Sequence, residues 1–310
     1  MIDYTVDALI NKVKTRGTIP TSQALYLPAD FVDIMSDVMH DTVVPAIVSV
    51  REEYFVTYQD QAIVAGQNNY RIPSRAVGNM LRDVVLVNSA GTEISIPRLD
   101  PESQKSSPSL VSQSTYGFKL MGDEVILIPT PAGTNGDSVR MYYERRPNNL
   151  ILAASAAKIL TFNPTTKIVG IDATPSNFAV TDTFDILRPD PIFSSVGDDI
   201  AITTLSGTNL TLTAALPSGI AAGQWIAESG LSPVPQIPYE GGLWLVHEAL
   251  CAVLEGMTDN AGLVNARKKA DRLKENFMKI ITPRVHGSPQ KIVQRSGIFD
   301  YSRVGGRWRR

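Results

Sequence analysis

The sequence predicts an α+β protein: a helical bundle formed by the N- and C-terminal helices, with β-rich domains inserted between them and an extended basic C-terminal arm. Apolar residues recur at three- and four-residue spacing near both ends, which is typical of helices with one buried face. The middle of the chain instead holds short β-rich runs separated by glycine and proline. These changes divide the chain into residues 1–60, 61–150, 151–238, 239–283 and 284–310.

The composition is that of a folded protein with substantial apolar cores. Of 310 residues, 43% are hydrophobic and 19% are charged, and the formal net charge of −2 gives no overall argument for a nucleic-acid or membrane partner. One cysteine excludes an intrachain disulfide, and three histidines leave little scope for a zinc site. The first residues lack the pattern of a signal peptide, and no apolar run approaches the length of a membrane helix, about 18 residues. We therefore expect a protein made inside the cell, without a membrane span.

Residues 1–60 are predicted to be helical. Asp3 can cap a first helix that continues to Lys14, and Gly17 ends it. A second helix is expected to start near Ala29, and Pro45 should kink or divide it because proline lacks a backbone N–H. The predicted buried face of this second helix contains Phe31, Ile34, Met35, Val38, Val43, Ile47, Val50, Tyr54 and Phe55.

The two central regions are predicted to be β-rich. In the first, strands are expected at 62–72, 81–87, 93–99, 124–128 and 139–144, with an exposed loop over 100–115. In the second, the spacing of the runs is typical of a small antiparallel sandwich or barrel. Its strands are expected at 167–172, 184–187, 200–205, 209–212 and 224–227, before a proline-rich connector at 232–238.

Residues 239–283 are predicted to form two helices that complete the bundle. The first should bury Leu243, Val246, Leu250, Val253, Leu254 and Met257 on one face. The second starts at a cap near Asp259, ends at Pro283, and repeats apolar residues at the spacing of a helix–helix seam: Leu263, Ala266, Ala270, Leu273, Phe277 and Ile280. We expect the main packing positions of the bundle, or of a ring built from it, to be Phe31, Ile34, Val38, Ile47, Tyr54, Leu263, Leu273 and Phe277.

The sequence provides little that could perform chemistry. Neither the glycine-rich phosphate-binding patterns nor the Gly-x-Ser-x-Gly nucleophile pattern occurs. Cys251 and His247 lie one helical turn apart, but Cys251 is best interpreted as a core residue, and His247 and His40 as surface or inter-helix polar groups. Adjacent carboxylates occur at 52–53 and 198–199, where we expect solvated or salt-bridged faces. We therefore predict no catalytic residue, no metal site and no cofactor.

The C-terminal arm, residues 284–310, is the most distinctive charge feature. It has seven basic side chains and one acidic side chain, so its charge is +6 and that of residues 1–283 is −8. The arm could be a solvated tail, a nonspecific binder of DNA phosphates, or a segment that folds onto a partner protein. We favour the third interpretation, because the interleaved apolar residues contribute nothing to phosphate binding. These apolar residues are Val285, Ile292, Val293, Ile298, Phe299 and Trp308.

A series of short motifs extends over nearly the whole chain. Its members are residues 7–16, 19–20, 44–47 and 51–56, YRIPSRA at 70–76, LRDV at 81–84, GDEVILIP at 122–129, YERRP at 143–147, PVPQIP at 233–238 and ITPRVHGSPQKI at 281–292. In this order the motifs resemble the head–tail adaptor, or connector, proteins of tailed bacteriophages. The resemblance is least specific over 151–232.

This resemblance implies a structural virion protein that forms a ring of twelve copies below the portal, extends the DNA channel and provides a docking platform for the tail. The implied partners are further copies of the chain, the portal protein, tail nozzle, tube or fibre proteins, and genomic DNA that passes without sequence-specific binding. The implied location is the virion neck, after synthesis in the host cytoplasm. By the same analogy, the arm contacts the portal through Arg284, Lys291, Ile292, Arg295, Ile298, Phe299, Arg303, Arg307 and Trp308.

Two other classes of protein are alternatives to the adaptor. Another neck or tail protein, such as a tail terminator or fibre-attachment collar, is the nearest alternative, but a tube terminator would be mainly β, whereas both ends of this chain are predicted to be helical. An enzyme would need a concave site with convergent polar groups. The sequence motifs do not predict one.

Overall fold

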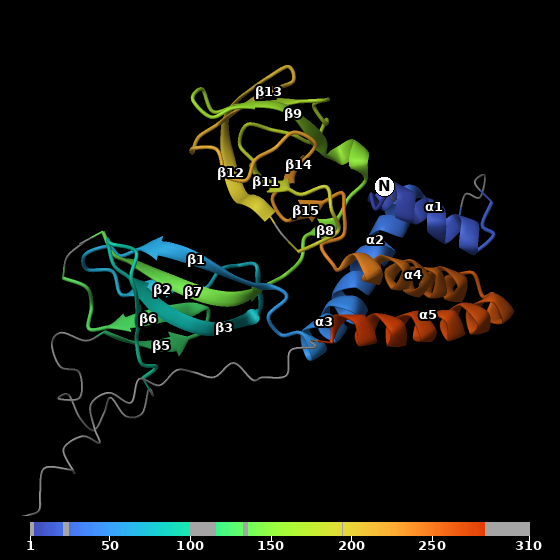
Figure 1. Ribbon diagram of the computed structural model, residues 1–310, viewed down its shortest axis with the longest axis horizontal. Coiled ribbons are helices and arrows are strands. Elements are labelled where there is room, and N and C mark those ends of the chain that lie inside the picture. Colours follow the sequence, from blue (N-terminus) through green and yellow to red (C-terminus); the bar gives the residue numbers. More distant parts are fainter. Residues whose placement is uncertain (1–2, 21–24, 100–115, 133–135, 194, 283–310) are drawn as a thin grey trace, which may run out of the picture.

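The computed structural model describes residues 3–20, 25–99, 116–132, 136–193 and 195–282. The predicted α+β class is confirmed, and the second β-rich region is a small closed barrel of six strands (Figure 1). The described residues form three apolar clusters: one among the helices, one in the first β-rich region and one in the barrel. We call these three parts the helical, sheet and barrel modules.

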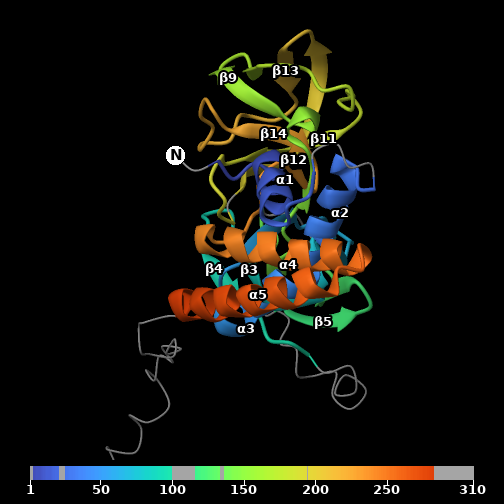
Figure 2. The same cartoon turned by 90° about the vertical axis from the view of Figure 1, so that its right-hand side faces the viewer.

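The helical module combines helices from the two ends of the described chain. Helix α4 packs on α1, α2 and α5, and α3 also contacts α5. Figure 2 shows α4 and α5 side by side along one face of the molecule. The bounds of the helices are α1 Val6–Arg16, α2 Pro28–Val38, η1 Met39–Val43, α3 Val44–Val50, η4 Tyr239–Gly241, α4 Gly242–Gly256 and α5 Asn260–Ile281.

Helix α1 is capped by Thr5 and not by Asp3 as predicted. The Thr5 hydroxyl accepts a hydrogen bond from the Ala8 backbone N–H, while the Asp3 carboxylate accepts one from the N–H of Thr5 itself. The helix ends at Arg16, two residues later than expected, and Gly17 follows it. Asp3 therefore lies two residues before the capping residue and binds its backbone N–H.

The predicted second helix is divided, as expected from Pro45. Between α2 and α3 lies the π-helical segment η1, whose wider turn lets the Val44 N–H donate to the Met39 carbonyl. Helix α3 ends at Val50, so the prediction that Tyr54 and Phe55 lie on this helix is wrong. Both residues lie in the turn that follows, where Phe55 is buried and Tyr54 packs against the same apolar cluster.

The sheet module starts at Val56, so residues 1–60 are not wholly helical. Strand β1 pairs with β7 along its whole length, and the four-stranded sheet has the order β1-β7-β3-β4. A three-stranded sheet of order β2-β6-β5 completes the module. The strands are β1 Val56–Ala62, β2 Asn69–Arg71, β3 Ala76–Val87, β4 Glu93–Ser95, β5 Gly117–Met121, β6 Glu124–Ile128 and β7 Ser138–Arg145.

Several strand predictions in this module need correction. The run predicted at 62–72 is the end of β1, a loop and β2, because pairing with two different strands separates its halves. The strand predicted at 93–99 stops at Ser95, while β3 extends further towards its N-terminus than predicted. Strand β5 was not predicted at all. The predicted loop at 100–115 lies outside the described residues.

The barrel module closes in the order β10-β13-β12-β11-β14-β9. Strand β13 matches its predicted bounds, whereas β9 was missed; it closes the barrel by pairing with both β10 and β14. A short parallel pair, β8 with β15, lies where the chain enters and leaves the barrel. The strands are β8 Asn149–Leu150, β9 Ala157–Asn163, β10 Ile168–Ile171, β11 Thr183–Leu187, β12 Ser195–Ser206, β13 Asn209–Leu212, β14 Trp225–Glu228 and β15 Leu231–Ser232.

The C-terminal helices differ from the prediction in how they are buried. Helix α4 is buried on nearly all sides, not on one face, because α1, α2 and α5 surround it, whereas Met257 just beyond its end is exposed. The predicted seam of α5 buries Ala266, Ala270 and Phe277, but Ile280 is 56% exposed. Helix α5 has 22 residues and α4 has 15, so the last turns of α5 extend past their partner.

Candidate functional site

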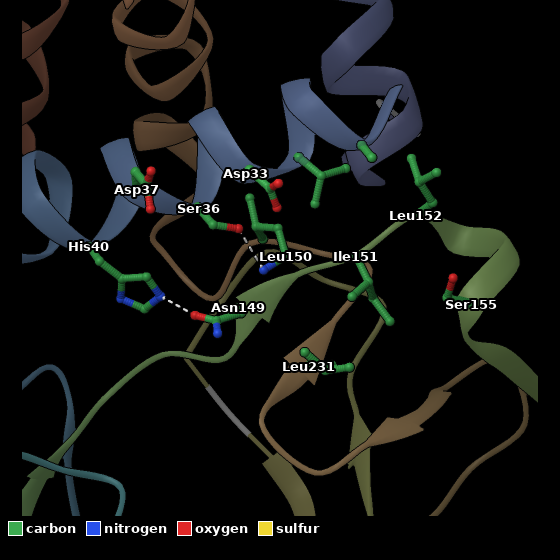
Figure 3. Close-up of a pocket in the computed structure, with 12 residues that line it drawn as sticks. Asp33, Ser36, Asp37, His40, Asn149, Leu150, Ile151, Leu152, Ser155 and Leu231 are labelled. Carbon is green, nitrogen blue, oxygen red and sulfur yellow. Dashed lines mark hydrogen bonds between the residues drawn. The ribbon is translucent and has the colours of Figure 1, made fainter. Parts of the chain in front are cut away.

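The segment that connects the sheet module to the barrel module lies against helix α2 and forms one wall of a hollow of about 660 Å³ (Figure 3). Ser36 of α2 accepts a hydrogen bond from the Leu150 N–H at 3.0 Å, which fixes the connecting segment beside the helix. The floor and rim of the hollow are formed by Ala29, Val32, Asp33, Ser36, Asp37, His40, Asn149, Leu150, Ile151, Leu152, Ser155 and Leu231.

A second hollow, of about 690 Å³, adjoins the first along η1 and α3. The two hollows share His40 and Asn149, whose side chains are joined by a hydrogen bond of 2.9 Å. The second hollow is lined by His40, Asp41, Val44, Pro45, Val48, Ser49, Val77, Met80, Glu144, Arg146 and Asn149. We call the two hollows together the helix groove.

The rim of the helix groove is acidic. Asp33, Asp37 and Asp41 follow one another at four-residue spacing, are all exposed, and take part in none of the ion pairs between described residues. Burial lowers the pKa of His40 more than its hydrogen bond to Asn149 raises it. His40 is therefore neutral at neutral pH and does not offset the carboxylates.

The groove thus combines an apolar floor with a negatively charged rim. Carboxylates at the edge of an apolar depression attract basic side chains, and the depression itself accepts apolar ones. This arrangement is suited to binding a polypeptide segment in which apolar and basic residues alternate.

A buried network of charged residues, which we call the ionic junction, joins the sheet module to the barrel module. Its centre is Asp185 on β11, whose side chain is 0% exposed and accepts hydrogen bonds from both terminal nitrogens of Arg75 at 2.8 and 3.1 Å. Asn148 donates to the same carboxylate at 2.7 Å. Arg145, at the end of β7, lies 3.6 Å from Asp185 and also pairs with Asp198 on β12. Residues from both modules therefore complete one network.

The charges in the junction stabilise one another. Burial alone would raise the pKa of Asp185, but the hydrogen bonds and positive charge of Arg75 outweigh burial and hold that pKa below its ordinary value. Burial alone would lower the pKa of Arg75, yet its contacts with Asp185 raise it. Both groups stay ionised at neutral pH. Because each depends on the other, the junction fixes how the two modules meet.

The carboxylate pair at 198–199 is salt-bridged, in line with its prediction. Adjacent strand residues normally point to opposite faces, but Asp199 has a φ of 52°, which breaks the alternation. As a result, one guanidinium, that of Arg75, lies 3.8 Å from Asp198 and 2.7 Å from Asp199.

The helices and the turn after α3 bring the predicted packing residues together, whereas the predicted arm residues lie outside the described part of the chain. Phe31, Ile47 and Phe277 are buried in the apolar cluster of the helical module. The partly buried residues packed against that cluster include Ile34, Val38, Tyr54, Leu263 and Leu273.

The histidine and cysteine of α4 are both buried. Cys251 is a core residue, as predicted, and burial raises the pKa of its thiol to about 11, so it is not a reactive thiolate. His247 contacts the guanidinium of Arg16 on α1, and burial together with that positive charge lowers its pKa to about 4. His247 is therefore an inter-helix polar group, one of the two placements predicted for it.

No protein-family model matches the chain, and no curated protein matches it significantly. Within the described residues, no helix has the length and apolar character needed to cross a membrane. In that same part of the chain, no group of three or more histidine, cysteine or acidic side chains is arranged to hold a metal ion.

The sequence analysis missed both the helix groove and the ionic junction. A partial signal for the groove was present in the four-residue spacing of Asp33, Asp37 and Asp41. No comparable signal existed for the junction, because Arg75 and Asp185 are 110 positions apart and pair only through the fold.

Proposed function

We propose that this chain is a structural adaptor of the tailed-bacteriophage virion, which forms a ring between the portal and the tail. The observation that carries the proposal is the architecture: helices from both ends of the described chain share one core, and two β modules inserted between them are locked together by buried charges. This is the construction of a rigid scaffold, and it agrees with the order of motifs that resembles head–tail adaptors.

In this proposal the helical module is a bundle that forms the wall of the ring. The sheet and barrel modules face outward or towards the tail, and the basic C-terminal arm contacts the portal. Twelve copies surround a channel through which DNA passes without being read. Heterologous contacts between identical subunits close such a ring and bury surface that one copy leaves exposed.

The ionic junction suits a load-bearing role. Burying ion pairs adds little net stability compared with apolar packing, because desolvation opposes the attraction between the charges. The advantage of the ionic junction is its geometric specificity. The bidentate contact between Arg75 and Asp185 forms at one relative placement of the sheet and barrel modules. A scaffold that must present the tail at a fixed height and angle benefits from that restriction.

The proposal is tested by co-assembly with the portal protein encoded in the same genome. Native mass spectrometry should show a complex in which this chain forms a closed ring on the portal. A chain that stays monomeric and does not bind the portal contradicts the proposal, and binding to tail-tube protein alone favours the tail-protein alternative.

The role of the arm is tested separately with a chain that ends at Pro283. We expect this chain to lose portal binding while its circular dichroism spectrum retains its helix and strand signals. A matched control keeps the arm and reverses two exposed basic residues of α5, Lys268→Glu and Lys269→Glu. Portal binding that survives deletion of the arm contradicts the assignment of the arm to the portal.

A further inference from the structure

We infer that the helix groove is a docking site for the C-terminal segment of the same chain, residues 283–310. The inference rests on the chemistry of the groove and the sequence of the segment, and it does not require that the proposed adaptor function is correct. It assigns the segment a place on its own subunit when no other partner is present.

The apolar parts of groove and segment match. The floor contains the half-buried Ile151, Leu152 and Leu231 in the first hollow, and Val48 and Met80 in the second. Met80 is 62% exposed, although it is a large apolar side chain. The segment carries apolar residues along its length that could cover this floor: Val285, Ile292, Val293, Ile298, Phe299 and Trp308.

The charges of groove and segment are also complementary. Asp33, Asp37 and Asp41 stand about one helical turn apart along the groove, and no described basic residue pairs with them. Glu144 lines the groove as well but is already paired with Arg82 at 3.2 Å. The segment has seven basic side chains and one acidic side chain. The groove therefore offers three carboxylates that have no ion-pair partner among the described residues, and the sequence of the segment supplies the opposite charge.

The path of the chain favours docking within one subunit. Helix α5 ends at Ile281 and contacts α3, and residues of α3 also line the groove. Figure 1 shows the end of α5 beside α3. A segment of this length can span tens of ångströms when extended, at about 3.3 Å per residue. A short tether gives the segment an effective concentration in the millimolar range at its own groove, which a second copy reaches only at high protein concentration.

The outer face of α5 is a poorer match for the groove. It is also basic, through residues that include Arg267, Lys268 and Arg272, but its exposed large apolar side chains are Val264 and Ile280 alone among the described residues. A charged helix face of this kind satisfies the acidic rim but leaves the apolar floor in contact with water. The C-terminal segment satisfies both.

The inference is tested by cysteine cross-linking in the full chain. One cysteine is placed on the exposed groove residue Ser49 (Ser49→Cys), and a second scans the segment at Ser288, Ser296 and Ser302. The native Cys251 is buried and stays in place. A short bismaleimide should link at least one pair within a single chain, which appears as a shift in mobility at monomer mass.

The control moves the first cysteine to Asn276 on the outer face of α5 (Asn276→Cys). Asn276 is exposed and lies only six positions before Thr282, so an undocked segment would meet it more often than it meets Ser49. We expect links to Ser49 to form at least tenfold faster than links to Asn276. Equal rates, or faster links to Asn276, would overturn the inference.

A charge variant tests the rim. The triple variant Asp33→Lys, Asp37→Lys, Asp41→Lys should slow linking to Ser49 at least tenfold, whereas the control Asp271→Lys, Glu275→Lys on α5 should leave it unchanged. Both variants are first compared with the parent by circular dichroism and urea unfolding. If the triple variant does not fold, the single variant Asp37→Lys is used with the same criterion, with a threefold slowing expected.

The remaining outcomes separate the possible occupants. Links between two chains, which increase with protein concentration, would show that the groove takes the segment of a neighbouring copy and would overturn docking within one subunit. The cross-linking experiment contains no portal protein, so its result does not depend on whether the chain binds the portal. Conversely, a negative cross-linking result does not contradict portal binding, which is measured separately by native mass spectrometry.

Discussion

The core of the helical module and the ionic junction are both buried and both join residues far apart in the sequence, but they differ in how they can fail. In the helical core, apolar side chains such as Met35 and Ile47 each contribute area, so shortening one removes part of the stabilisation. In the junction, Asp185 is buried as a charge, and removing its bidentate partner Arg75 leaves that charge only partly compensated. In the apolar core, the loss of stability therefore grows with the number of atoms removed from a side chain. In the buried ionic network, removing a single charged partner causes a large loss at once.

The largest effect is expected from Arg75→Met, which keeps much of the aliphatic stem and removes the charge. The buried carboxylate of Asp185 loses two hydrogen bonds, and we expect the free energy of unfolding to fall by about 4 kcal/mol. Urea unfolding of the full chain measures the change. The control is Arg71→Met, four positions away, whose partner Asp123 is exposed; it should change stability by less than about 1 kcal/mol. Similar losses in the two variants would remove the distinction between buried and exposed pairs.

This prediction has a pH signature. In the parent protein the depressed pKa of Asp185 stabilises the fold fully above the unfolded value of 3.8, and that stabilisation is lost as pH falls through the folded pKa. In Arg75→Met, the backbone hydrogen bonds from Asp199 and Gly230 still oppose burial, but the largest opposing contributions to the pKa of Asp185 are lost, so the carboxyl protonates at higher pH than in the parent. The gap in stability between parent and variant should therefore narrow as pH falls below neutrality. A gap that stays constant down to pH 4 contradicts the assignment.

The helical core should show the graded response. Ile47 is fully buried, and we expect Ile47→Ala to reduce the free energy of unfolding by about 3 kcal/mol and Ile47→Val by about 1 kcal/mol. Ile280→Ala, at a position that the sequence analysis placed in the seam but that is 56% exposed, should change stability by less than about 0.5 kcal/mol. An effect of Ile280→Ala as large as that of Ile47→Ala would mean that α5 is covered in the functional state.

The histidine buried within α4 should make the helical core sensitive to acid. Burial and the charge of Arg16 lower the pKa of His247 to about 4. Its neutral form stabilises the fold fully above the unfolded pKa of 6.5, and this stabilisation is lost as pH falls towards 4, on the order of 2 kcal/mol. Urea unfolding between pH 7 and pH 4 should show this slope in the parent, and His247→Gln should reduce it. An unchanged slope in the variant would assign the acid sensitivity to other groups.

The smallest effect should come from an exposed ionic cluster on the four-stranded sheet. Arg140 bonds Asp60 at 2.7 and 2.8 Å, contacts Glu93 and lies over the ring of Tyr58. The Arg140 side chain is about as covered as that of Arg75, but its partners Asp60 and Glu93 are 37% and 42% exposed, whereas Asp185 is fully buried. Arg140→Ala should therefore reduce stability by less than about 1 kcal/mol. Adding 1 M NaCl should remove most of that difference, whereas the effect of Arg75→Met should persist. If 1 M NaCl removes the stability losses of both Arg140→Ala and Arg75→Met, the ion pairs of the junction are accessible to solvent ions and are not buried.

The parts of the fold that were predictable are those in which local pattern and tertiary context agree. Strand β13 alternates buried Leu210 and Leu212 with more exposed neighbours, and this alternation identified its bounds. Strand β1 was missed because Tyr54 and Phe55 continue the apolar spacing of the preceding helix, and only pairing with β7 makes the following residues a strand. Strand β9 was missed in a similar way, since its exposed Leu160 and Phe162 give no alternation of apolar and polar residues.

The candidate site was less predictable than the fold. The helix groove forms where α2, η1 and α3 meet a segment more than a hundred residues further along the chain, and its Ser36–Leu150 and His40–Asn149 contacts have no local signal. The junction depends in addition on Asp199. Its left-handed backbone conformation breaks the alternation of side chains along the strand and brings its carboxylate to Arg75. Charge counted by segment was informative, because it separated a basic C-terminal arm from an acidic body.

The most direct test of the adaptor proposal is a search for this chain in virus particles made by the organism that encodes it, followed by a reconstruction of their neck by electron cryo-microscopy. The proposal predicts a closed ring of this chain between portal and tail, with the helical modules forming its wall and the C-terminal segments in contact with portal subunits. A neck that lacks this chain, or that holds it without contact with the portal, would contradict the proposal.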